Sequence, residues 1–253
     1  MKIEVLFPEI CNLYGDLANV RYLKESVDNT EVIETSLKAK PAFVDKKIDL
    51  IYMGTTTEDG IKLAVNALKP YVNKLKELID NGQFILLTGN AQDIFCSHII
   101  IDDKQKIDCL GIINAHANYQ MLKRHNSFYI GSLDTMEIVG FKSIFGFCYG
   151  NDSDSNGVSN YLSQNFWFKN ERGFGTDKTG DFEGFKINNL LSTHLIGPLL
   201  PLNPLLTKWL ISKINENNGI HSTDIKVAHE EAAMNAYYQR LKEMKNEHFD
   251  PNY

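Results

Sequence analysis

The sequence has few cysteines, no excess of basic residues and no long apolar run, and each absence excludes a class of protein. Its 253 residues include four cysteines, none in a C-x-x-C pair, so their spacing indicates neither a zinc site nor a redox pair. The formal net charge of −6 argues against a nucleic-acid surface, because phosphates require a basic face. The first residues are too few and too polar for a signal peptide, and no apolar run reaches membrane-spanning length. We therefore expect a cytoplasmic protein with reduced thiols, no membrane span, no metal and no cofactor.

Apolar segments alternate with helical patterns in the first hundred residues. Strands are predicted over residues 2–7, 31–35, 49–53 and 84–87, and helices after Asp16 and over 59–80, with a break at Pro70. Strands that alternate with helices at this spacing imply right-handed βαβ units and a parallel sheet. The chain is long enough for a sizeable core and shows no repeat or clear linker, so we predict a single domain spanning 1–253.

The second half of the chain has shorter β-rich pieces separated by polar loops. Strands are predicted over 98–101, 136–141, 166–169, 185–187 and 191–195, polar loops over 150–160 and 170–181, and a helix over 205–214. One long helix, from about 225 to 249 with alanines along one side, is expected to pack on the domain.

The segment 83–92 is the most informative part of the chain. An apolar strand ends at Thr88, and a tight turn through Gly89 and Asn90 leads into helical spacing from Ala91. A strand that ends in such a turn presents the turn residue at the carboxyl edge of the sheet, where several hydrolases carry a nucleophile. Thr88 is therefore interpreted either as an exposed nucleophilic hydroxyl or as a cap of the following helix.

Three segments together resemble a known family. They are Asn12-Leu-Tyr-Gly-Asp16, Leu87-Thr-Gly-Asn-Ala-Gln92 and Ser192-Thr-His-Leu-Ile-Gly-Pro-Leu-Leu200. In this order they resemble the class I glutamine amidotransferases of the CobB/CobQ type, in particular the GatD-like subunits that pair with a Mur-ligase-like partner, MurT, to amidate lipid II. The resemblance implies a flavodoxin-like, three-layer, doubly wound α/β sheet.

The resemblance also implies a chemistry that this sequence does not fully support. In the family a cysteine thiolate attacks the side-chain amide of glutamine, backbone N–H groups stabilise the oxyanion, and a histidine carries the proton. By resemblance the cysteine position falls at Thr88, the histidine position at Ile196 and the oxyanion loop at residues 54–57. His194 is two residues before Ile196, which displaces an imidazole by roughly 6–7 Å along an extended segment. Conventional glutamine hydrolysis is therefore expected to be lost.

The substrate pocket that the resemblance implies is nevertheless expected to be present, with L-glutamine or a related compound as its ligand. Its predicted lining is Gly54, Thr55, Gly89, Asn90 and His194.

Several other residues have simpler interpretations. Asp16 is interpreted as a helix cap, although its loop lies where it could touch a ligand. Cys96, two turns into the helix after the turn, is interpreted as a buried thiol. No metal-ligand spacing is found among the histidines His98, His116, His125 and His194, and His116 is assigned to a polar loop.

Three functions remain open from the sequence. The first is a non-catalytic amidotransferase homologue that supports a partner, with a MurT-like ligase as the implied one. The second is an active amidotransferase subunit with unconventional residues, acting in lipid II or cobyrinate-type amidation. The third is a small-molecule binding or sensing module that reuses the pocket.

Overall fold

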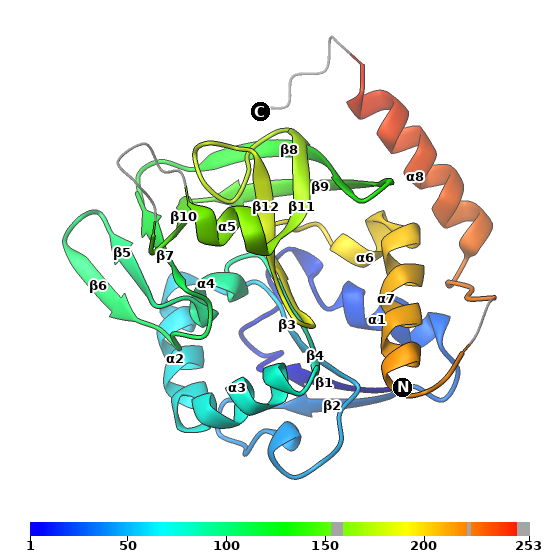
Figure 1. The fold of residues 1–253 in the computed structure, drawn as a ribbon, viewed down its shortest axis with the longest axis horizontal. Helices are drawn as coiled ribbons and strands as arrows, with labels where there is room; N and C mark the ends of the chain where they lie inside the picture. Colours follow the sequence, from blue (N-terminus) through cyan, green and yellow to red (C-terminus); the bar gives the residue numbers. More distant parts are fainter. Residues whose placement is uncertain (153–158, 222–223, 247–253) are drawn as a thin grey trace.

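A mixed sheet of nine strands organises the computed structural model of the protein (Figure 1), which describes residues 1–152, 159–221 and 224–246. In those ranges the strand order is β2-β1-β3-β4-β13-β12-β11-β8-β9. The strands are β1 (Lys2–Leu6), β2 (Glu31–Thr35), β3 (Leu50–Met53), β4 (Phe84–Thr88), β8 (His125–Leu133), β9 (Met136–Ile144), β11 (Phe166–Arg172), β12 (Phe182–Ile187) and β13 (Leu190–Thr193). The first four and β13 pair in parallel, as predicted, and the others are antiparallel.

Helices cover both faces of the parallel half of the sheet. One face carries α1 (Ala18–Ser26), α6 (Leu199–Leu202) and α7 (Pro204–Asn217); the other carries α2 (Glu58–Leu68), α3 (Val72–Asp80) and α4 (Ala91–Phe95). In β4, Phe84 and Leu86 enter the core beneath α1, α6 and α7, whereas Ile85 and Leu87 enter the core beneath α2, α3 and α4. A strand buried on both faces needs a continuous apolar run, because successive side chains point to opposite sides. The three-layer, doubly wound fold predicted from the sequence is confirmed.

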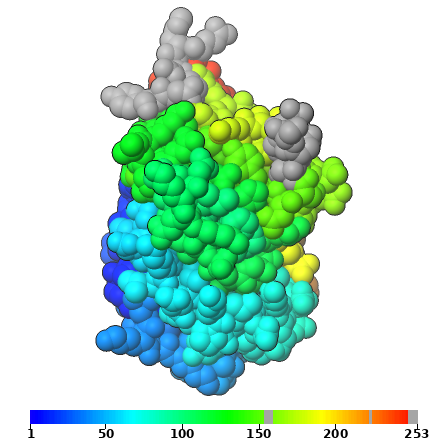
Figure 2. Space-filling view, turned by 90° about the vertical axis from the view of Figure 1, so that its left-hand side faces the viewer, coloured from blue at the N-terminus to red at the C-terminus, as the bar shows by residue number. Residues whose placement is uncertain are grey.

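A second, four-stranded sheet lies beside the α2–α4 layer. Its order is β10-β7-β5-β6, and its strands are β5 (His98–Ile101), β6 (Gln105–Asp108), β7 (Ala115–Tyr119) and β10 (Gly146–Gly150). Its apolar side chains join the core beneath α2, α3 and α4. The green surface of this middle part of the chain lies above the cyan surface of α2 and α3 (Figure 2). A short helix, α5 (Asn160–Asn165), follows β10.

Local details differ from the predictions in several places. The helix predicted over 59–80 does break at Pro70, as predicted, into α2 and α3, with the 3-10 turn η3 (Lys69–Tyr71) between them; two more such turns are η1 (Leu13–Gly15) and η2 (Ala42–Val44). The assignment of His116 to a polar loop is wrong, because this residue lies in β7. Cys96 is buried, as predicted, but it directly follows the five-residue helix α4 instead of lying within a longer one.

The C-terminal helix α8 (Glu230–Met244) packs on the antiparallel half of the sheet. Its Tyr237, Leu241 and Met244 form a third core with β8 and β9. It begins later than predicted, and its predicted end at 249 lies outside the described residues, as does most of the predicted loop 150–160. Among the described helices, none combines the length and apolar character required to cross a membrane.

Candidate functional site

The three sequence motifs meet at one pocket beyond the carboxyl ends of the parallel strands. The pocket encloses about 160 Å³. Each motif contributes a pair of lining residues: Leu13 and Tyr14 from η1, Gly89 and Asn90 after β4, and His194 and Ile196 after β13. Ligands of open α/β sheets bind at this edge, because the loops that follow the strands gather there. Segments that are distant in the sequence thus form a single candidate site.

Most of the predicted pocket residues are found at the pocket. Thr55, Gly89, Asn90 and His194 line it, but Gly54 does not. A Cβ at Gly54 would lie 2.7 Å from a backbone oxygen, so this glycine permits a close crossing of two loops instead of contact with a ligand. Ile196 also lines the pocket, where its backbone N–H donates to a carbonyl of β9. An apolar side chain there cannot transfer a proton.

Thr88 lies at the end of β4, but its side chain is buried away from the pocket lining. Its Oγ1 donates to Oδ2 of Asp16 at 3.1 Å and lies 2.9 Å from the hydroxyl oxygen of Tyr52. The prediction of an exposed hydroxyl is therefore wrong. The helix-cap interpretation is also wrong, because the N-cap residue of α4 is Asn90, whose side chain bonds the backbone of Thr56 instead.

The left-handed residue of the turn is Gly89, one position after Thr88. Its φ is +59°, and a Cβ built on it would lie 2.0 Å from Oγ1 of Thr55. A nucleophile elbow places its reactive side chain on the strained residue of a strand-to-helix turn. In this protein that residue has no side chain, and Thr55 fills the adjacent space.

Asp16 is the hub of the buried hydrogen bonds beneath this turn. Besides Thr88, its Oδ2 accepts from the backbone N–H of Thr55 at 2.7 Å and from the hydroxyl of Thr55 at 2.5 Å. The N-cap of α1 is Leu17, so the prediction that Asp16 caps this helix is wrong. Asp16 does not line the pocket either, and burial raises its pKa. Asp16 holds the β3 and β4 loops together.

An imidazole and a carboxylate meet at the pocket. Nε2 of His194 lies 2.8 Å from Oδ1 of Asp93, and the hydroxyl of Tyr119 donates to Oδ2 of Asp93 at 2.5 Å. Because a carboxylate only accepts, Nε2 carries a proton, and Nδ1 has no partner among the described residues. All three residues line the pocket. Asp93 and Tyr119 were not predicted, although the Asp93 position in the first turn of a helix after the strand was a usable signal.

A buried ion pair fixes the segment that carries His194. Lys142 and Glu183 are fully buried and bonded to each other, and Lys142 also donates to the carbonyl of Gly175 at 2.7 Å. Oε1 of Glu183 accepts from the hydroxyl of Thr193 at 2.7 Å and from the backbone N–H of His194 at 2.8 Å. Burial opposes ionisation of Glu183, but the Lys142 charge and these donors hold its pKa below the usual range.

A positively charged side chain, that of Arg124, lies at the edge of the pocket next to η1. The guanidinium of Arg124 donates to the hydroxyls of Tyr14 and Ser143, each at 2.9 Å, and lies 4.2 Å from the ring centroid of Phe145. These four residues line the pocket. The Arg124 group can pair with an anionic part of a ligand.

None of the four cysteines lines the pocket. All are buried, and burial raises the pKa of both Cys11 and Cys109 to about 12. Cys96 and Cys148 have raised pKa values for the same reason. They lie with Asp93 in a group of three potential metal ligands, which the cysteine spacing in the sequence did not indicate.

Comparison with known proteins places this fold among the glutamine amidotransferases. A glutamine amidotransferase from Thermotoga maritima superposes with a TM-score of 0.51 at 9% identity, over 94% of this chain and 92% of the other. A second glutamine amidotransferase structure gives 0.50 at 8% identity, over 86% and 99%. These similarities define the fold as that of the class I glutamine amidotransferases.

Sequence comparison identifies a more particular relative. The chain is 26% identical over 211 residues to the GatD subunit of lipid II isoglutaminyl synthase (glutamine-hydrolyzing) from Staphylococcus aureus (strain N315). The match covers 83% of this chain and 82% of GatD. No family model matches the chain. The protein is thus a homologue of a glutamine amidotransferase subunit.

Proposed function

We propose that the protein is a GatD-like amidotransferase subunit that has lost conventional glutamine hydrolysis and supports a partner enzyme through its retained fold. The observation that carries this proposal is the side-chain-free corner at Gly89, with Thr55 beside it. No thiol faces the pocket, and the hydroxyl of Thr88 is engaged with Asp16 and Tyr52. The attacking atom of the family chemistry therefore has no counterpart at the turn.

The partner is inferred from the relative. GatD is a subunit of a glutamine-hydrolyzing synthase, and the match extends over most of both chains. We take the partner of this protein to be a Mur-ligase-like enzyme of the MurT type. Amidation by such a complex would need free ammonia or another nitrogen donor. The pocket, in which the Arg124 guanidinium can pair with a ligand carboxylate, suits L-glutamine or a related amino acid as a bound but unhydrolysed ligand.

One feature favours the alternative of an active amidotransferase subunit. His194 lines the pocket and is hydrogen-bonded to Asp93, and an imidazole–carboxylate pair is suited to general-base chemistry. This alternative requires a nucleophile from outside the usual position, such as an activated water or a residue of the partner.

A glutaminase assay decides between these two functions. Ammonia release from L-glutamine is measured for the protein alone and with a MurT-like ligase added. We expect no release above a His194→Ala control under either condition. Release that depends on His194 would establish the active alternative. Thermal stabilisation by glutamine without a co-purifying ligase would instead favour a sensing module.

Repair of the corner tests the assignment of positions. Two matched variants each carry Ile196→His: one adds Thr88→Cys, the other adds Gly89→Cys with Thr55→Gly to make room for the new side chain. Mass spectrometry then follows the adduct with a glutamine-mimicking electrophile. The buried location of Thr88 predicts an adduct in the second variant only. An adduct restricted to the first variant would restore Thr88 as the nucleophile position.

A further inference from the structure

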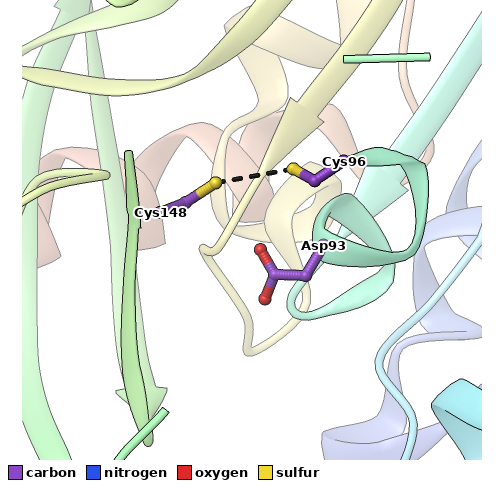
Figure 3. A group of neighbouring side chains, drawn as sticks. All are labelled: Asp93, Cys96 and Cys148. Carbon is purple, nitrogen blue, oxygen red and sulfur yellow. Dashed lines mark hydrogen bonds between the residues drawn. The ribbon is translucent and has the colours of Figure 1, made fainter. Parts of the chain in front are cut away.

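Two thiols and a carboxylate converge in the core behind the pocket. Cys96 directly follows α4, Cys148 lies in β10, and Asp93 is one turn before Cys96 (Figure 3). Their potential ligand atoms all lie within 4.8 Å of one another. The two sulfur atoms face each other across the gap between α4 and β10, and the Asp93 carboxylate points toward the same space. We propose that this trio is a binding site for a zinc ion.

The separations fit the coordination geometry of zinc. Two sulfurs at about 2.3 Å from a tetrahedral zinc are roughly 3.7 Å apart. The observed distance between Sγ of Cys96 and Sγ of Cys148 is 3.5 Å. A zinc-bound oxygen and sulfur are roughly 3.5 Å apart, so the carboxylate needs a shift of little more than ~1 Å to join them. The two thiol protons leave to solvent as the ion binds, and the thiolates and carboxylate become its ligands.

The surroundings support the carboxylate as a ligand. Oδ1 of Asp93 is bonded to His194 and Oδ2 to Tyr119, which fixes the orientation of the carboxylate. A carboxylate oxygen has a second lone pair, so each of these oxygens keeps one free for a metal. Metal-ligating carboxylates are themselves hydrogen-bonded in this manner. Two thiolates with one carboxylate favour zinc over magnesium or calcium, which prefer oxygen alone.

A zinc ion can reach this site from the pocket, and once bound it links two parts of the fold. Asp93 lines the pocket, so an ion can enter from that side, and the fourth coordination position faces a water or a pocket ligand. An ion held there links the end of α4 in the main layer to β10 in the smaller sheet. It also holds Asp93 in place against His194. This inference concerns how firmly Asp93 is held beside His194, and it does not depend on whether glutamine is hydrolysed.

Zinc loading of the full chain tests the proposal. The protein is purified without a histidine tag, incubated with zinc chloride, desalted and analysed by inductively coupled plasma mass spectrometry. We expect one zinc per chain for the wild type and for the control Cys11→Ser, whose thiol lies elsewhere in the core. The double variant Cys96→Ser with Cys148→Ser should bind zinc more than about 100-fold more weakly, beyond the loss typical of removing an outer hydrogen-bond partner.

X-ray absorption on the zinc-loaded wild type keeps the test decisive if the double variant fails to fold. Two sulfur neighbours at about 2.3 Å are expected. The proposal is overturned if the wild type binds no stoichiometric zinc, if the bound zinc has no sulfur neighbours, or if the double variant binds as tightly as wild type. A Cys96–Cys148 disulfide that persists in the presence of a thiol reductant would overturn it as well.

Discussion

Substitution of Lys142 by methionine should destabilise the protein strongly. The side chain is fully buried, and it donates to Glu183 and to the carbonyl of Gly175. Methionine preserves most of the volume but leaves a buried carboxylate without its counter-ion. Removing one partner of a buried pair costs about 3–5 kcal/mol, because the remaining charge stays desolvated. At roughly 2–4 °C per kcal/mol for a chain of this size, Tm should fall by about 6–20 °C.

Urea unfolding followed by circular dichroism measures this loss, with Lys76→Met on the exposed side of α3 as the matched control. The control should change the free energy of unfolding by less than about 0.5 kcal/mol. Adding Glu183→Gln to Lys142→Met should recover part of the loss, because a neutral amide is less costly to bury and its oxygen still accepts from His194. A loss below about 1 kcal/mol in Lys142→Met, or no recovery in the double variant, would refute the reasoning.

Three further predictions concern the site and its support. Thr88→Val should cost about 1–3 kcal/mol in urea unfolding, because Asp16 loses a buried donor, whereas Thr88→Ser should cost less; equal losses would argue against the hydroxyl. Asn203→Ala should cost at least about 2 kcal/mol, because its side chain bonds the N–H and carbonyl of Val139 and the carbonyl of Leu199, and an unchanged Tm would contradict this. The lowered pKa of Glu183 means that the unfolded chain binds its proton more tightly. The free energy of unfolding should therefore fall as the pH drops below about 4.3, and this acid slope should be shallower in Glu183→Gln.

The third family-like segment, residues 192–200, and the residues that follow it show how a sequence signal corresponds to a structural role. Gly197 has a φ of +99°, which favours glycine, and Asn203 ties the end of α6 to β9 through two hydrogen bonds to Val139. The segment between them covers the α1 face of the sheet through Leu199 and Leu200. This segment supports the fold, and it holds the neighbouring Ile196 at the pocket.

Local sequence was sufficient for the parallel half of the sheet. Apolar segments between turn residues predicted β1 to β4 within one residue at each end, and the signal is strongest in β3 and β4, because a strand buried on both faces must be apolar throughout. The antiparallel half was harder. The strand β8 was not predicted, since its polar and apolar residues alternate with glycines and aromatics without a clear period. In the smaller sheet β6, β7 and β10 were missed as well.

The candidate site, like the fold, was predictable from the sequence only in part. The sequence by itself determined the fold, the gathering of three motifs at one sheet edge, and most of the pocket residues, because loops that follow parallel strands meet at that edge. Only the tertiary structure decided that Thr88 is buried with Asp16 and that Gly89 is the left-handed corner residue. It also brought Asp93 to His194 and Cys96 to Cys148. These contacts join residues that are 101 and 52 positions apart, and side-chain direction at such distances depends on packing that no local pattern contains.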